Sequence, residues 1–200
     1  MPVIADIKRG DIAKTAEMYA MGHFTGDFEA DFVTLAPYMG LDSISLSAYA
    51  EKQGKGMFVL CRTSNGGAKD FEYEKLADGR HVYDLVGDKL NALGKDYMGE
   101  HGYSSIGLVI GGTHIEEATE IRAKYQDSFF LIPGYGAQGG KAEDIASICR
   151  RATAAWSTPA AASCWPTRSS RAQLRRGRLQ RVCEHEGGHC PCVQPAVRPL

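Results

Sequence analysis

Short apolar runs alternate along the first three quarters of the chain with stretches in which apolar residues recur at helical spacing. Most of the runs are continuous Val, Ile, Leu and Phe segments, which is typical of parallel strands buried on both faces. We expect five such strands, at residues 2–6, 32–36, 57–63, 105–111 and 128–133. Strands that alternate with helices in this way indicate repeated βα units on a parallel sheet.

Three segments between and after these strands have the spacing of one buried helix face. The apolar positions are Val82, Leu85, Val86, Leu90, Leu93 and Tyr97 in the first segment, Ile115, Ala118 and Ile121 in the second, and Ile145, Ile148 and Cys149 in the third. Thr113 followed by Glu116 predicts a capping box at the start of the second helix. This α/β pattern fits either an open doubly wound sheet or part of an eight-stranded barrel, and periodicity does not choose between them.

The amino-acid composition changes at Arg151. All Lys, Asp, Ile, Phe, Tyr and Met residues precede position 152, whereas residues 152–200 contain both Trp, four of the six Cys, and seven Arg against two Glu. We therefore expect a folded α/β domain at residues 1–151 and a disordered or frame-shifted tail at 152–200.

The overall charge argues against two classes of partner. A formal net charge of -1 provides no basic field that would attract nucleic acid or an anionic membrane. No apolar run approaches the roughly 20 residues that cross a bilayer, and the start of the chain does not resemble a signal peptide. We expect a cytoplasmic protein with neither nucleic-acid nor membrane partners.

Charged residues follow the first predicted strand in the order Asp6-Ile7-Lys8-Arg9-Gly10-Asp11. The two-residue period of a strand places Asp6 and Lys8 on one face, at the carboxyl end where α/β folds keep their active sites. A lysine between two carboxylates stays cationic, which suits proton donation better than Schiff-base formation. A solvated run of surface ion pairs is the equally weighted alternative.

Two further loops follow predicted strands. Thr63-Ser64-Asn65-Gly66-Gly67 combines hydroxyls with small residues that allow a ligand to approach the backbone, although the segment taken alone favours a plain turn. The loop Pro133-Gly134-Tyr135-Gly136-Ala137-Gln138-Gly139-Gly140 precedes a predicted helix, so its amides could hold an anion such as phosphate.

These segments together resemble the longer bacterial branch of the orotidine 5'-phosphate decarboxylase family. The matching text is DIKRGDIAKTAEMYA, VLCRTSNGG, GLVIGGTH and LIPGYGAQGG, in that order along the chain. The resemblance implies a (β/α)8 TIM barrel, with the five predicted strands as its third to seventh. It also implies conversion of orotidine 5'-phosphate to UMP and carbon dioxide in de novo pyrimidine synthesis.

The resemblance assigns catalytic roles to the charged segment. Lys8 matches the lysine that delivers a proton to C6 of the pyrimidine, and Asp6 matches the carboxylate beside the leaving group. Asp11, Ile12 and Thr15 match the part that reaches into the active site of a neighbouring subunit. A homodimer with shared active sites is therefore implied.

The resemblance also assigns the ligand-binding loops. Ser64 matches the hydroxyl that holds the pyrimidine, and Gln138 matches the residue that links this hydroxyl to the 5'-phosphate. Gly134, Gly136 and Gly139 belong to the phosphate loop. No metal ion and no cofactor are implied, because preoriented charges act on the carbanion directly.

Two features depart from the family pattern. The family's first two βα units, with another catalytic lysine, have no counterpart here, and the phosphate-binding arginine of the eighth strand is missing after Arg151. We therefore expect the 200-residue chain itself to be inactive. Reading residues 152–166 two bases later, in GC-rich codons, yields a text similar to the eighth strand, which suggests a reading-frame slip. Independent DNA reads with an intact frame across codons 150–155 would remove that hypothesis.

Two alternative functions remain open. One is a metal-dependent sugar-phosphate decarboxylase or synthase of the same barrel superfamily, and the other is a non-catalytic fragment.

The tail also holds residues of the types that bind zinc, at Cys183, His185, His189, Cys190 and Cys192. Their spacing matches no trusted metal motif, so we expect no metal site there.

Overall fold

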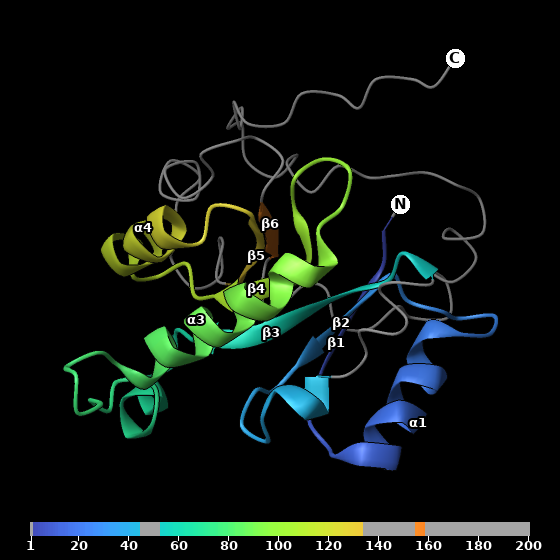
Figure 1. The fold of residues 1–200 in the computed structure, drawn as a ribbon, viewed down its shortest axis with the longest axis horizontal. Coiled ribbons are helices and arrows are strands. Elements are labelled where there is room, and N and C mark those ends of the chain that lie inside the picture. The colour runs from blue at the N-terminus through green and yellow to red at the C-terminus, as the bar shows by residue number, and fades with distance from the viewer. Residues whose placement is uncertain (1, 45–52, 134–154, 159–200) are drawn as a thin grey trace.

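The structure is a computed structural model that describes residues 2–44, 53–133 and 155–158, and these residues form one sheet with helices packed against it (Figure 1). Its strands are β1 (Ile4–Arg9), β2 (Phe32–Leu35), β3 (Gly56–Arg62), β4 (Ser104–Ile110), β5 (Ser128–Pro133) and β6 (Ala155–Thr158). Its α-helices are α1 (Ala13–Phe24), α3 (Val82–Gly94) and α4 (Ile115–Lys124). Short 3-10 helices lie at η1 (Leu41–Ile44), η2 (Gly66–Asp70) and η3 (Lys95–Tyr97).

The order of strands across the sheet is their order along the chain, and every neighbouring pair is parallel. A doubly wound sheet reverses its strand order at one point, so this sheet has the order of a barrel wall. Right-handed crossovers between parallel neighbours place the connecting helices on one face. The carboxyl ends of all six strands consequently lie along one edge.

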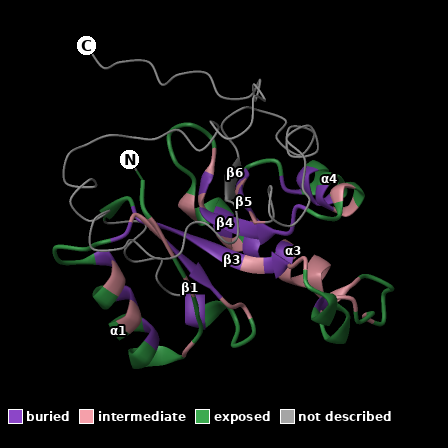
Figure 2. Cartoon of the chain, turned by 180° about the vertical axis from the view of Figure 1, so that it is seen from behind, coloured by how far each residue is buried: buried purple, intermediate pink, exposed green. Residues whose placement is uncertain are grey.

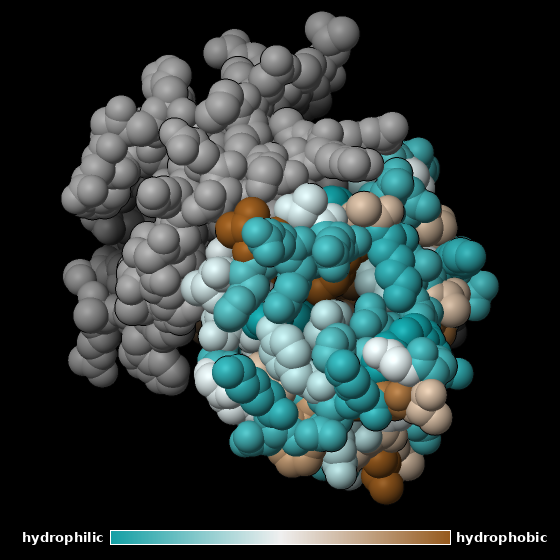
Figure 3. Space-filling model, turned by 90° about the vertical axis from the view of Figure 1, so that its left-hand side faces the viewer, coloured by the Kyte–Doolittle hydropathy of each residue, from teal (hydrophilic) through white to brown (hydrophobic). Residues whose placement is uncertain are grey.

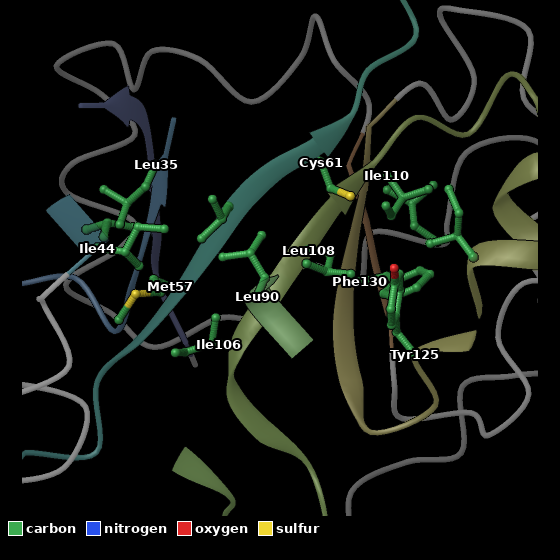
Figure 4. Close-up of a cluster of buried hydrophobic side chains, with 14 of the residues drawn as sticks. Leu35, Ile44, Met57, Cys61, Leu90, Ile106, Leu108, Ile110, Tyr125 and Phe130 are labelled. Carbon is green, nitrogen blue, oxygen red and sulfur yellow. The ribbon is translucent and has the colours of Figure 1, made fainter. Parts of the chain in front are cut away.

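The main core fills the space between the sheet and the helices (Figure 4). Its buried strand residues include Leu35, Met57, Cys61, Ile106, Leu108, Ile110 and Phe130, and its helix residues include Phe24, Leu90 and Ile121. Figure 2 shows the same division, with burial concentrated along β3, β4 and β5 and exposed residues on the outer side of α1. Each large apolar side chain buried here contributes about 1.5–3 kcal/mol.

The opposite face of the sheet is packed by aromatic rings that lie over glycines of the neighbouring strand. Phe32 of β2 covers Gly56 of β3, and Phe58 of β3 covers Gly107 of β4, where an added Cβ would lie 2.6 Å from the ring. The two ring centroids are 5.4 Å apart. This face is therefore also apolar and close-packed, as in the interior of a barrel.

The five predicted strands are confirmed: the strand at residues 128–133 has the predicted boundaries, and those of the other four differ by at most three residues. The capping-box prediction for α4 is wrong, because His114 is the N-cap of this helix and makes no side-chain capping bond. A capping box occurs instead at α3, between His81 and Asp84. The hydrophobic pattern did not predict α1 or β6, and the helix predicted around Ile148 lies outside the described residues.

None of the described helices is long and apolar enough to cross a membrane. The side of the molecule that carries α4 is mostly hydrophilic, with small and separate hydrophobic areas (Figure 3). This polarity agrees with the sequence of α4, IEEATEIRAK, whose buried residues are few.

A glycine in α3 determines how closely this helix approaches the end of α4. A Cβ added to Gly87 would lie 2.6 to 2.8 Å from the ring atoms of Tyr125, which is itself buried. We expect Gly87→Ala to lower the free energy of unfolding by about 1–3 kcal/mol, because the ring or the helix must move. The matched control is Gly22→Ala in α1, where nothing lies within 4 Å. This control should stabilise by about 0.5–1 kcal/mol through helix propensity. Urea unfolding of both variants tests the pair, and equal effects would contradict the packing argument.

Candidate active site

The carboxyl end of β1 is irregular where the charged motif lies. The pairing of β1 with β2 shifts between Ala5 and Arg9, because four residues of β1 advance against two of β2. Lys8 has a φ of 45°, in the left-handed region that a non-glycine residue rarely adopts. Such conformations cost on the order of 1–3 kcal/mol and persist where surrounding contacts enforce them.

The contacts that hold this bulge involve one buried threonine. Thr34 of β2 is 0% exposed, and its hydroxyl accepts a hydrogen bond from the amide of Lys8 at 2.8 Å. The same hydroxyl donates to Oδ1 of Asp6 at 2.9 Å. Oδ1 of Asp6 also pairs with Nζ of Lys8 at 2.5 Å. The predicted meeting of Asp6 and Lys8 is therefore present, within a bulge and not a regular strand.

The Asp6–Lys8 pair is accessible to a ligand. The side chains of Lys8 and Asp6 are 49% and 52% exposed. Among the described residues Lys8 forms its ion pair with Asp6 and not with Asp11, whose carboxylate accepts the amide of Ile12 at 2.8 Å. Among the described residues, Asp6 is thus the ion-pair partner of this half-exposed ammonium.

Asp11, Ile12 and Thr15 lie together at the start of α1. Ile12 is the N-cap of the helix, and its carbonyl accepts the amide of Thr15 at 3.2 Å. Ile12 is 54% exposed although it is apolar. Thr15 is also exposed, and Asp11 is half-buried.

The end of β3 places Ser64 on the same edge of the sheet as Lys8. The two strands are separated by β2, which corresponds to roughly 10 Å at the usual strand spacing. A Cβ added to Gly111, just after β4, would lie 2.9 Å from the Cβ and the amide nitrogen of Ser64. Only a glycine permits this close approach of the two strand ends.

The predicted phosphate loop, with Gly134, Gly136, Gln138 and Gly139, lies outside the described residues. The Cys and His residues of the tail also lie outside them. In the part of the chain that is described, no three His, Cys, Asp or Glu side chains are grouped in a way that could hold a metal ion. Cys61 is buried, and burial, followed by the charges of Glu72 and Asp84, raises its pKa to about 12, so this thiol is not a nucleophile.

Comparison with known proteins identifies the family. The model of the orotidine 5'-phosphate decarboxylase / HUMPS family matches residues 1–157. The chain belongs to this family. An orotidine 5'-phosphate decarboxylase of Clostridium perfringens (strain SM101 / Type A) is 66% identical over 149 residues, which cover 74% of this chain and 52% of the relative. The chain spans about half the length of such relatives.

Solved structures agree with the family assignment. Leishmania donovani UMP synthase matches with a TM-score of 0.69 and 32% identity, covering 88% of this chain and 38% of that chain. Orotidine 5'-monophosphate decarboxylase from Methanocaldococcus jannaschii, complexed with the inhibitor BMP, matches with a TM-score of 0.56 and 29% identity, covering 74% of this chain and 59% of that chain. The sheet described above is therefore part of a (β/α)8 barrel, as the resemblance implied.

A buried arginine, Arg62, lies two residues before Ser64 in this decarboxylase-family chain and binds groups from neighbouring elements. The side chain of Arg62, at the end of β3, is 2% exposed, and its Nε donates to Oε2 of Glu117 at 2.7 Å. Its terminal nitrogens donate to the hydroxyl of Tyr73 and to the carbonyl of Thr63. The Tyr73 hydroxyl also donates to Glu117, at 2.8 to 2.9 Å. This network joins β3, the loop before α3, and α4.

Sequence reasoning missed three parts of this site. Thr34 had one available signal, since it is the polar residue inside the apolar run 32–36. Arg62 and Glu117 had none, because they are 55 residues apart and meet only through the packing of α4 on the sheet.

The Arg62–Glu117 pair makes the stability of the fold depend on pH. Burial by itself raises the pKa of Glu117, but the hydrogen bonds from Tyr73 and Arg62, together with the Arg62 charge, outweigh it and hold the pKa below its usual value. A depressed carboxyl pKa adds stability above the unfolded-state pKa of about 4.3, and this stability is lost as the pH falls through the folded-state value.

We expect Glu117→Gln to lower the free energy of unfolding at pH 7 by about 2 kcal/mol, because Arg62 stays buried without its counter-charge. The deficit relative to the unmodified chain should shrink as the pH falls from about 5 to 3. Urea unfolding across this range measures it, with Glu120→Gln on the exposed side of α4 as the control. A deficit that is independent of pH would contradict this assignment.

Proposed function

We propose that this chain carries the proton-donating part of an orotidine 5'-phosphate decarboxylase site, with UMP as product in de novo pyrimidine synthesis. The observation that carries the proposal is the arrangement of Lys8, Asp6 and Thr34 at the carboxyl end of β1, in a chain of this family. Relatives named orotidine 5'-phosphate decarboxylase favour this reaction over the sugar-phosphate chemistry of related barrels.

The chemistry follows from the charges at this strand end. When the bond from C6 to the carboxylate breaks, carbon dioxide leaves and the electron pair stays on C6. Lys8 donates a proton from Nζ to C6, which forms the C6–H bond of UMP and leaves a neutral amine. Asp6 holds the ammonium in place beforehand, and its negative charge beside the substrate carboxylate disfavours the ground state. A fixed ammonium beside a developing carbanion acts more strongly than one in bulk water.

The remaining binding roles are also proposals. Ser64 holds the pyrimidine, Gln138 connects its hydroxyl to the 5'-phosphate, and the loop amides at Gly134, Gly136 and Gly139 bind that phosphate. The complex of the Methanocaldococcus jannaschii enzyme with the inhibitor BMP supports a ligand site in this family. The reaction as written uses no cofactor, and we place the enzyme in the cytoplasm.

We further propose a homodimer in which Asp11, Ile12 and Thr15 complete the site of the partner subunit. Exposed apolar side chains on and near α1 support an interface there; they are Ile12, Met18, Met21, Phe28 and Tyr38. Ile12→Glu should shift the protein toward the monomer in analytical ultracentrifugation, because a charge then replaces an apolar contact. An unchanged sedimentation coefficient would place the interface elsewhere.

Ligand binding tests the proposed site. In calorimetric titration, Lys8→Ala should bind orotidine 5'-phosphate at least roughly tenfold more weakly than the unmodified chain does, because a charge-assisted contact contributes about 1.5–3 kcal/mol. Ser64→Ala should lose a few-fold, corresponding to about 1 kcal/mol. Lys89→Ala, an exposed lysine in the middle of α3, is the matched control and should bind like the unmodified chain.

The same samples report turnover through the absorbance of orotidine 5'-phosphate. Turnover that Lys8→Ala abolishes would establish the reaction and would refute the expectation that the 200-residue chain is inactive. Absence of both binding and turnover in the unmodified chain would reject the proposed function for this chain.

A further inference from the structure

The segment that carries Ser64 has little apolar packing of its own. Between the end of β3 and η2, Thr63 and Ser64 are half-buried, and Asn65, Gly66 and Gly67 are exposed. Buried apolar residues resume at Ala68. The conformation of the backbone at Ser64 therefore depends on polar contacts and on the neighbouring strand end.

One carboxylate binds this segment through two hydrogen bonds. Oε2 of Glu72 accepts the amide of Thr63 at 2.8 Å, and Oε1 of Glu72 lies 2.6 Å from the hydroxyl of Thr63, which also has Oδ1 of Asn65 as an acceptor at 2.7 Å. Both donors belong to the residue that directly precedes Ser64. Hydrogen bonds to an ionised carboxylate are shorter and stronger than neutral ones.

Glu72 is itself held by the start of α3 and by the buried arginine network. Its carbonyl accepts the amide of Tyr83 at 3.1 Å, and the adjacent Tyr73 hydroxyl contacts Arg62 and Glu117. The carboxylate thus projects from an anchored stretch of backbone toward the loop. Its two contacts with Thr63 therefore hold this residue at a fixed place relative to the start of α3.

The strand end of β4 restricts Ser64 from another direction. Gly111 approaches the backbone of Ser64 closely enough that a Cβ there would lie 2.9 Å away, and its amide donates to the carbonyl of Arg62 at 2.7 Å. Ser64 can neither shift toward β4 nor rotate freely while Thr63 is bound by Glu72. These two restraints leave a narrow range for the backbone at Ser64 and for the position of its Cβ.

We propose that Glu72 is a positioning residue, which fixes the backbone at Ser64, and with it the place from which the Ser64 side chain projects, by accepting the amide and the hydroxyl of Thr63. This inference rests on the proposed function for the role of Ser64 in ligand binding, whereas the effect on the backbone is independent of any ligand. Glu72 touches no substrate and carries out no proton transfer.

Two variants grade the loss of this contact. Glu72→Gln keeps the length of the side chain but leaves a single acceptor oxygen, and Glu72→Ala removes both acceptors. Glu74→Gln is the matched control, because Glu74 lies two residues away and is exposed.

The first measurement is amide hydrogen exchange of residues 59–71 in the full chain without ligand. We expect the amide of Thr63 to exchange roughly tenfold faster in Glu72→Gln, and faster still in Glu72→Ala. The control should match the unmodified chain, and the main-core amides of β3 should keep their protection in all variants.

The second measurement is the calorimetric affinity for UMP. Glu72→Gln should weaken it a few-fold, and combining it with Ser64→Ala should add little, because both changes act through one hydroxyl. Unchanged exchange at Thr63 would overturn the inference, as would faster exchange with unchanged UMP affinity or a fully additive double variant. If the unmodified chain binds no UMP, the exchange data alone decide whether Glu72 positions the segment, and the titration and turnover of orotidine 5'-phosphate decide the proposed function separately.

Discussion

Parallel pairing of the strands in chain order is the constraint on which the site depends. It brings the carboxyl ends of β1, β3, β4 and β5 to one edge, although the residues concerned are spread over more than a hundred positions. Hydrogen bonds continue this pairing past the strand ends, from Gly111 to Arg62 at 2.7 Å and from Gly112 to Pro133 at 3.1 Å. The loops that follow the strands therefore start from fixed points.

Polar groups buried at this edge are the second determinant of its geometry. Thr34 and Arg62 are almost completely buried, and a buried donor without an acceptor is costly. Each is satisfied by a group from another element, Thr34 by Asp6 of β1 and Arg62 by Glu117 of α4. The positions of Asp6 and Glu117 are consequently restricted by these hydrogen bonds. At Asp6 the restricted geometry includes the left-handed backbone of Lys8.

The two halves of the site differ in how they are held. Lys8 and Asp6 are half-exposed and held by a short ion pair over a buried hydroxyl, which leaves the ammonium accessible. Ser64 is held through its neighbours, by a carboxylate on Thr63 and a glycine of β4. An accessible charge and a restricted hydroxyl suit a ligand that is bound at one end and reacts at the other.

The sequence by itself determined the βα pattern, the strands that start at positions near 4, 32, 56, 104 and 128, and the charged motif with Asp6 and Lys8. Hydrophobic periodicity and motif text are local properties, so they are readable without a structure. The family match then agreed with the decarboxylase resemblance that those motifs carried.

Periodicity did not determine the order of the strands, which the motif resemblance implied and the structure shows, and only the tertiary structure decided the bulge at Lys8 and the residues that support the site from a distance. Local patterns are compatible with several sheet orders, and the alternation of a regular strand does not predict where two residues are inserted against a neighbour. Thr34, Glu72 and Glu117 obtain their roles from contacts across 9 to 55 positions of sequence. Such contacts exist only after the sheet and helices have packed, because packing is what brings donor and acceptor within hydrogen-bonding distance.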